Sequence, residues 1–77
     1  MSYMANKSMH RAVAFGAALR TRRKALRLTQ RDVADLVGVT RQTIGRLERG
    51  DATVALGTAL AVAGALGIAI LNAGRDA

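Results

Sequence analysis

Two neighbouring segments of the chain carry the same pattern, and it constrains the fold more than any other feature. Residues 29–38 (TQRDVADLVG) and 40–50 (TRQTIGRLERG) each begin with threonine and end with glycine. Threonine is favourable at a helix N-cap, and glycine readily adopts the positive φ that ends a helix. Apolar residues recur at helical spacing between these ends. The pattern therefore predicts two short helices joined by a tight turn at Gly38.

The flanking sequence predicts two further helices. Proline is absent, and alanine, leucine and arginine are abundant, which favours helix. We expect a first helix over about residues 11–27, with Phe15, Leu19 and Leu26 on one face, and a fourth over about residues 54–67, ended by Gly67. Residues 1–9 are expected to form a disordered tail, and residues 10–67 the domain. A chain of 77 residues has a marginal core, which a second copy often completes.

Positive charge is concentrated in the first two thirds of the chain. Lysine and arginine number 12 against 5 acidic residues, a net charge of +7, and ten of the cations lie between Arg11 and Arg49. From Ala52 to Gly74 no residue is charged. This distribution favours a polyanionic partner, with nucleic acid ahead of an anionic membrane. The alternative is a surface that arginine merely keeps solvated.

The sequence offers little for catalysis or metal binding. It has no cysteine, and therefore neither a disulfide nor a thiolate zinc site. His10 is the only histidine, and no Ser/His/Asp set, carboxylate pair or phosphate-binding glycine loop can be assembled. We therefore expect a protein without enzyme activity, metal or cofactor. The first residues lack the apolar stretch of a secretory signal, so a cytoplasmic location is expected.

The unit from Gln30 to Arg49 has the layout of a DNA-binding helix-turn-helix. Ala34 is small where the two short helices must approach each other, and Val39 follows the turn and enters the core. Ile44 and Leu47 anchor the second short helix from beneath. The outward residues of that helix are then Arg41, Gln42, Thr43, Gly45, Arg46 and Arg49.

These outward side chains suit the major groove. Arginine binds guanine through two hydrogen bonds, and glutamine binds adenine in the same way. The predicted base contacts are Arg41, Gln42 and Arg46. The predicted phosphate contacts are Gln30, Arg31, Thr40, Thr43 and Arg49. Gly45 either lets the helix lie closer to DNA or is a tolerated surface glycine.

The segment LTQRDVADLVGVTRQTIGRLERG resembles the helix-turn-helix of the lambda-repressor-like (Cro/Xre-type) transcriptional regulators. FGAALRTRRKALRLTQ is similar to the first helix of that family, and TVALGTALAVAGALGI to its fourth, so the resemblance covers about Phe15 to Ile68. It implies an all-α, four-helix DNA-binding domain. It also implies a partly buried ion pair between Arg23 and Glu48 that fixes the recognition helix, the alternative being two unrelated surface charges.

The uncharged C-terminal segment allows three interpretations. Ala52 to Gly74 is long enough to span a membrane, but its eight alanines and four glycines contribute little insertion energy, and the core needs the fourth helix. No membrane partner is therefore expected. A fifth helix would lack a capping residue and an acidic first turn. The alternation in GIAILNA favours a short β-strand over residues 68–73, followed by a tail over residues 74–77.

A single strand is not stable alone, so we predict that it pairs with the same strand of a second copy. The residues predicted in this pairing are Ile68, Ile70 and Leu71. A homodimer suits a palindromic operator. This ending resembles the HipB-like antitoxins, which implies a repressor of its own operon that binds a HipA-like serine/threonine kinase toxin. A stand-alone or phage-type repressor is the alternative.

Overall fold

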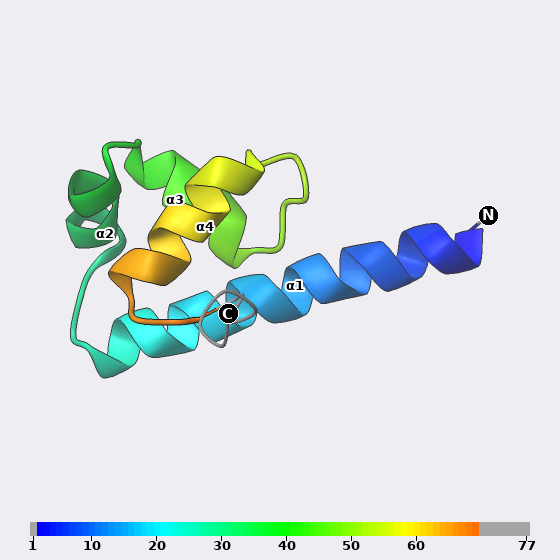
Figure 1. Cartoon of the computed structure of the whole chain (residues 1–77), viewed down its shortest axis with the longest axis horizontal. Coiled ribbons are helices and arrows are strands. Elements are labelled where there is room, and N and C mark those ends of the chain that lie inside the picture. Colours follow the sequence, from blue (N-terminus) through cyan, green and yellow to red (C-terminus); the bar gives the residue numbers. More distant parts are fainter. Residues whose placement is uncertain (1, 70–77) are drawn as a thin grey trace, which may run out of the picture.

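The computed structural model describes residues 2–69, with side chains from residue 9 onward. Its helices are α1 (Ser2–Ala25), α2 (Gln30–Val37), α3 (Arg41–Glu48) and α4 (Leu56–Ala65). Helices α2, α3 and α4 gather beside the C-terminal half of α1, and the N-terminal part of α1 extends beyond them (Figure 1). No strand occurs within the described range. The prediction of an all-α, four-helix domain is therefore confirmed.

The bounds of α1 differ from the sequence-based expectation at both ends. The helix begins at Ser2 instead of Arg11 and ends at Ala25 instead of Arg27. Residues 2–9, which we expected to belong to a disordered tail, are therefore helical. Residues 2–15 contain no glycine or proline. Helix propagation adds one hydrogen bond for each residue that is fixed, so a helix formed by packing at its C-terminal half continues until a breaker stops it.

The core lies where the four helices meet. Leu19 of α1, Val33 of α2 and Ile44 of α3 have no exposed surface. The other buried apolar residues are Ala34, Leu47, Ala59, Val62, Ala63 and Leu66. Helices α2 and α3 have only 8 residues each. Isolated helices shorter than about 12 residues are marginal in water, so burial of these side chains stabilises the two short helices.

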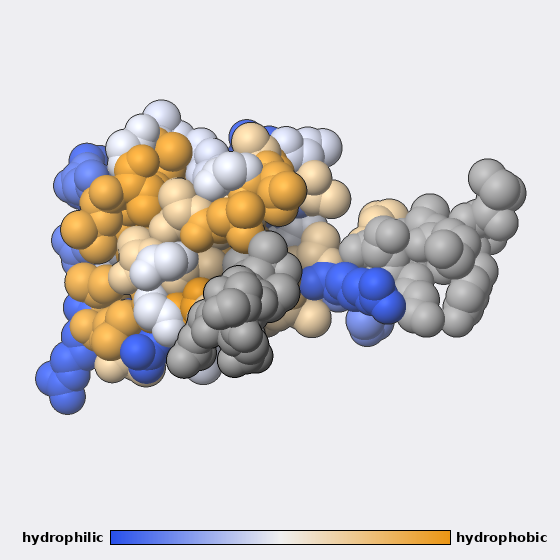
Figure 2. All heavy atoms as spheres, in the orientation of Figure 1, coloured by the Kyte–Doolittle hydropathy of each residue, from blue (hydrophilic) through white to orange (hydrophobic). Residues whose placement is uncertain are grey.

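The uncharged C-terminal part of the chain forms α4, which buries Val62 and Ala63 in this core. The face of the molecule over α4 is rich in apolar residues, and strongly hydrophilic residues lie at its margins (Figure 2). Leu56 is the most exposed large apolar side chain of α4, at 73%. Among residues 2–69, no helix is both long enough and apolar enough to cross a membrane.

Each described helix ends in the same backbone motif. A main-chain N–H donates to the carbonyl oxygen five residues earlier, and the residue before that N–H has a positive φ, which is the Schellman arrangement. The bonds run from Leu28 to Arg23, from Val39 to Ala34, from Asp51 to Arg46 and from Ile68 to Ala63. The left-handed residues are Gly38, Gly50 and Gly67, as predicted, and also Arg27.

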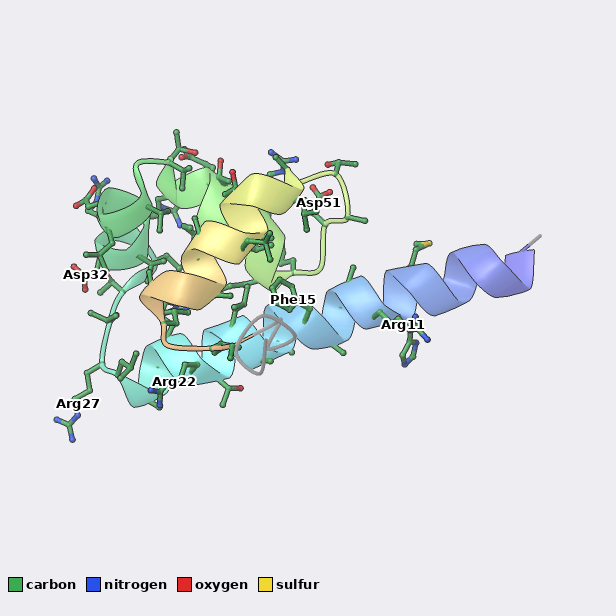
Figure 3. The ribbon with its side chains drawn as sticks, viewed as in Figure 1. Arg11, Phe15, Arg22, Arg27, Asp32 and Asp51 are labelled. Carbon is green, nitrogen blue, oxygen red and sulfur yellow. The ribbon has the colours of Figure 1, made fainter. Side chains whose placement is uncertain are left out.

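Arg27 is the exception among these left-handed residues, and its replacement by glycine is expected to stabilise the protein. Its φ is 60°, and its side chain is directed away from the body of the molecule (Figure 3). A residue with a Cβ atom in this conformation costs about 1–2 kcal/mol. The greater freedom of glycine in the unfolded chain offsets about 0.4–1 kcal/mol of this cost.

We therefore expect Arg27→Gly to raise the free energy of unfolding by about 0.5–1 kcal/mol, which corresponds to a Tm increase of roughly 2–8 °C. Thermal unfolding followed by circular dichroism measures it. Lys24→Gly is the matched control, since it places glycine inside α1 and should lower Tm. A lower Tm for Arg27→Gly as well would contradict the assignment of strain to Arg27.

Candidate nucleic-acid interface

Helices α2 and α3 form the predicted helix-turn-helix, and local hydrogen bonds fix where each begins. The Thr29 hydroxyl accepts from the Asp32 N–H at 3.0 Å, and the Asp32 carboxylate accepts from the Thr29 N–H at 2.8 Å. These bonds from Thr29 lower the pKa of Asp32. The Thr40 hydroxyl accepts from the Thr43 N–H at 3.1 Å. Both predicted N-caps are confirmed, and Gly38 makes the turn with a φ of 78°.

Helix α3 buries one side and exposes the other. Ile44, Leu47 and Glu48 are buried, whereas Arg41, Gln42 and Arg49 are exposed. Gly45 lies four residues after Arg41 on the outward side of α3, but it differs from the prediction in being buried. A Cβ atom on Gly45 would lie 3.2 Å from Nη1 of Arg49 and 3.7 Å from Oε1 of Gln30. Gly45 therefore makes room for these two side chains, and it is not a surface glycine.

A buried ion pair holds α3 against α1. Arg23 Nε lies 2.6 Å from Glu48 Oε2, and Arg23 Nη2 donates to Glu48 Oε1 at 3.0 Å. Only 8% of Arg23 and 9% of Glu48 is exposed. Arg23 Nη1 also donates to the Leu28 carbonyl at 2.8 Å. Two parallel hydrogen bonds fix both distance and orientation, so the pair fixes the C-terminal end of α3 on α1.

The ion pair continues to the surface through Gln30. Gln30 Nε2 donates to Glu48 Oε1 at 3.1 Å, and Gln30 Oε1 accepts from Arg41 Nη1 at 3.0 Å. Burial raises the pKa of Glu48, but the hydrogen bonds from Arg23 and Gln30 and the neighbouring arginine charges outweigh burial, so the net pKa is lowered. A continuous chain of polar contacts therefore joins the interior to Arg41, a predicted base contact.

Arg46 is held by the connection between α3 and α4. Its Nε donates to Asp51 Oδ2 and its Nη2 to Thr53 Oγ1, both at 2.9 Å. The Thr53 hydroxyl and N–H both donate to Asp51 Oδ1. Hydrogen bonds from Thr53 and then from Arg46 hold the pKa of Asp51 far below its ordinary value. Figure 3 shows Asp51 at the loop beyond α3.

Sequence analysis missed Asp51 and Thr53, although a signal for Asp51 was present. Gly50 was identified as the left-handed residue that ends α3. In a Schellman motif the N–H of the following residue bonds to the carbonyl at the start of the last turn, which here is that of Arg46. The backbone therefore brings the acidic residue directly after Gly50 close to Arg46, within reach of its side chain.

This geometry agrees with comparisons to known proteins. A family model described as helix-turn-helix matches residues 19–71. The chain belongs to the helix-turn-helix family. A relative from Methanothermobacter thermautotrophicus, an uncharacterized HTH-type transcriptional regulator, is 51% identical over 49 residues, which is 64% of this chain and 71% of the relative. The resemblance to Cro/Xre-type regulators is confirmed.

The remaining predicted phosphate contacts of this helix-turn-helix protein lie around two surface hollows. Arg31 and Thr40 line one hollow together with Arg41 and Gln42. Arg49 lines the other together with Gln30 and with Arg20 of α1, a cation that sequence analysis did not select. The Thr40 and Thr43 hydroxyls are 2.9 Å apart. The first hollow therefore places Arg31 of α2 beside Arg41 of α3, and the second places Arg20 of α1 beside Arg49.

The predicted dimer strand lies mostly outside the described residues. Ile68 is partly buried and contacts the core cluster of its own chain. Ile70 and Leu71 fall beyond residue 69, so the pairing of residues 68–73 with a second copy stays a prediction. Within residues 2–69, no three histidine or acidic side chains converge where they could hold a metal ion.

Proposed function

We propose that this protein is a transcriptional repressor that binds, as a homodimer, a palindromic operator in duplex DNA. Membership of the helix-turn-helix family and the relative named as a transcriptional regulator support DNA-binding regulation. The observation that carries the proposal is the exposed side of α3. It presents Arg41 and Gln42 to solvent, while Glu48, the last residue of the helix, is tied to Arg23 of α1.

The mechanism is occlusion of a promoter, and we infer that the promoter is its own. Helix α3 enters the major groove, where Arg41, Gln42 and Arg46 contact base edges. The residues that contact phosphates are Gln30, Arg31, Thr40, Thr43 and Arg49. These contacts orient the helix and make binding depend steeply on salt. A protein with this role works in the cytoplasm, associated with the nucleoid.

The first test is a gel mobility shift with the gene's own upstream DNA and a scrambled duplex of equal length at physiological salt. Selective binding to the upstream DNA is expected, with a dissociation constant that rises steeply with salt. Equal, weak binding to both duplexes would contradict sequence-specific repression. Such a result would mean that the positive charge attracts DNA without any preference for its sequence.

Arg41→Ala is expected to relax the preference at one base pair and to cost about 1–3 kcal/mol of binding free energy on the preferred sequence. The physical reason is the loss of two parallel hydrogen bonds to a guanine. Arg49→Ala is the matched control, since it should weaken binding to all sequences alike and reduce the salt slope by about one. If Arg41→Ala also weakens all sequences equally, Arg41 is a phosphate contact.

The dimer is tested by Ile70→Asp. A carboxylate in an apolar strand pair loses its hydration without gaining a partner, so the variant should sediment as a monomer where the wild type sediments as a dimer. Ile70→Val is the matched control, since it keeps an apolar, β-branched side chain at the same position and should remain a dimer. A dimeric Ile70→Asp would show that residues 68–73 do not hold the two copies together.

The antitoxin role depends on the same segment. The resemblance to HipB-like antitoxins rests on the predicted strand over residues 68–73, of which residues 70–73 lie beyond the described range. Copurification with the product of a neighbouring kinase-like reading frame tests this role. A stand-alone or phage-type regulator would bind its operator without such a partner.

A further inference from the structure

The bonds of Arg46 leave one defined part of its guanidinium group free. A guanidinium has five N–H donors. Asp51 and Thr53 accept from Nε and from one N–H of Nη2, which together form the side edge of the group. The end edge, made by Nη1 and the second N–H of Nη2, is not used by these bonds. That edge can donate two parallel hydrogen bonds to O6 and N7 of a guanine.

The acceptors that hold Arg46 are themselves fixed by the backbone. The Asp51 N–H donates to the Arg46 carbonyl at 3.0 Å, so the Schellman motif at Gly50 places the carboxylate beside Arg46. The Thr53 N–H donates to Asp51 Oδ1 at 2.8 Å, which fixes the carboxylate orientation. Neither contact depends on a long, mobile side chain. Arg46 is therefore oriented by the loop that ends α3.

Arg46 also lies on the same face of α3 as another predicted base contact. It follows Gln42 by four residues on α3, so the two side chains share one face of the helix. Its side chain is 43% exposed despite its contacts. The held arginine therefore borders the surface that carries the other predicted base contacts.

We propose that Asp51 and Thr53 are specificity-determining residues, which orient Arg46 for contact with a guanine at one position of the operator. This inference rests on the proposed function. An unrestrained arginine must be ordered when it binds a base, and it can contact a nearby phosphate instead. Asp51 removes both disadvantages, because it orders Arg46 before binding and its negative charge repels phosphate.

The test compares wild type and Asp51→Ala on a series of operator duplexes in which each base pair is changed in turn. Wild type should prefer guanine at one position. Asp51→Ala should reduce that preference by about 2- to 12-fold, the cost of ordering one long side chain, and leave the preferences at other positions unchanged. Arg46→Ala should abolish the preference at the same position. Adding Asp51→Ala to Arg46→Ala should then change nothing further there.

Asp35→Ala is the control for charge, because it removes one exposed carboxylate from α2. It should tighten binding to all duplexes alike and leave the preferred bases unchanged. If Asp51→Ala behaves in the same way, Asp51 acts only through its charge, and the inference is wrong. Thr53→Val keeps the shape of Thr53 without its hydroxyl and should also reduce the guanine preference, which provides a second test should Asp51→Ala not fold.

Different results would overturn the proposed function and the role of Asp51 and Thr53. A wild-type protein without sequence preference would overturn the proposed function itself. A selective wild-type protein whose base preferences survive both Asp51→Ala and Thr53→Val would overturn only the role of these two residues.

Discussion

Replacing Glu48 with alanine is expected to destabilise the fold by about 3–5 kcal/mol. The substitution leaves the guanidinium of Arg23 buried with only the Leu28 carbonyl among its present acceptors, and it removes an acceptor of Gln30. Small domains have total stabilities of only about 5–15 kcal/mol, so this loss is a large fraction of the whole. Urea unfolding at neutral pH measures it.

The double variant Arg23→Met/Glu48→Leu is the control for this prediction. Replacement of both partners of a buried ion pair by apolar residues of similar size is often neutral, because no unpaired charge remains. The double variant should therefore recover most of the stability that Glu48→Ala loses. If Glu48→Ala alone unfolds at the wild-type urea concentration, the ion pair does not hold α3 in place.

The lowered pKa of Glu48 also gives the sign of the pH dependence. Because its pKa in the folded protein lies below the ordinary value of 4.5, the unfolded chain binds the proton first as pH falls. The stabilisation is fully present above pH 4.5 and is lost as pH falls through the folded pKa. The urea midpoint should therefore be nearly constant from neutral pH down to about pH 5 and fall below it. Glu48→Gln should show a smaller fall over the same range.

Gly16→Ala should have the second large effect, destabilising the fold by roughly 3 kcal/mol or more. A Cβ atom on Gly16 would overlap the Leu47 carbonyl oxygen and lie 2.8 Å from that of Glu48. Both are backbone atoms, which no side-chain rotation can move. In the same contact, a Cβ atom on Gly50, which follows the end of α3, would lie 2.6 Å from the Val13 Cα. The C-terminal end of α3 and the turn after it can therefore approach α1 this closely only with glycine at both positions.

Gly64→Ala is the matched control, because a Cβ atom there has no neighbour within 4 Å. It lies inside α4, where alanine is up to about 1 kcal/mol more favourable than glycine. Thermal unfolding should show a lower Tm for Gly16→Ala and a higher one for Gly64→Ala. Equal Tm values for Gly16→Ala and wild type would show that α1 and α3 separate at little cost.

The helix ends could largely be predicted from sequence, because capping depends on local chemistry. Thr29 and Thr40 bond to N–H groups only three residues away, and Gly38, Gly50 and Gly67 adopt conformations that other residues avoid. Local patterns fail where a non-glycine residue takes the same conformation, as Arg27 does. They also fail at the beginning of α1, where Asn6 and Ser8 belong to the helix although both residue types are favourable N-caps.

The site could be predicted in outline but not in its contacts. Outward arginine and glutamine side chains on α3 follow from helical periodicity. The burial of Gly45 does not, because it results from cover by Gln30 of α2 and by Arg49, which follows α3. Such contacts depend on tertiary packing and on side-chain conformation, which periodicity does not determine.

The polar chain from Arg23 through Glu48 and Gln30 to Arg41 has a consequence for the exchange of specificity between relatives. Recognition helices are natural units to transplant, but α3 of this protein depends on Gln30 before it and on Asp51 and Thr53 after it. A graft of residues 41–48 alone would separate Arg41 and Arg46 from the groups that orient them. The transferable module is the segment 29–53, together with an arginine at the Arg23 position of the recipient.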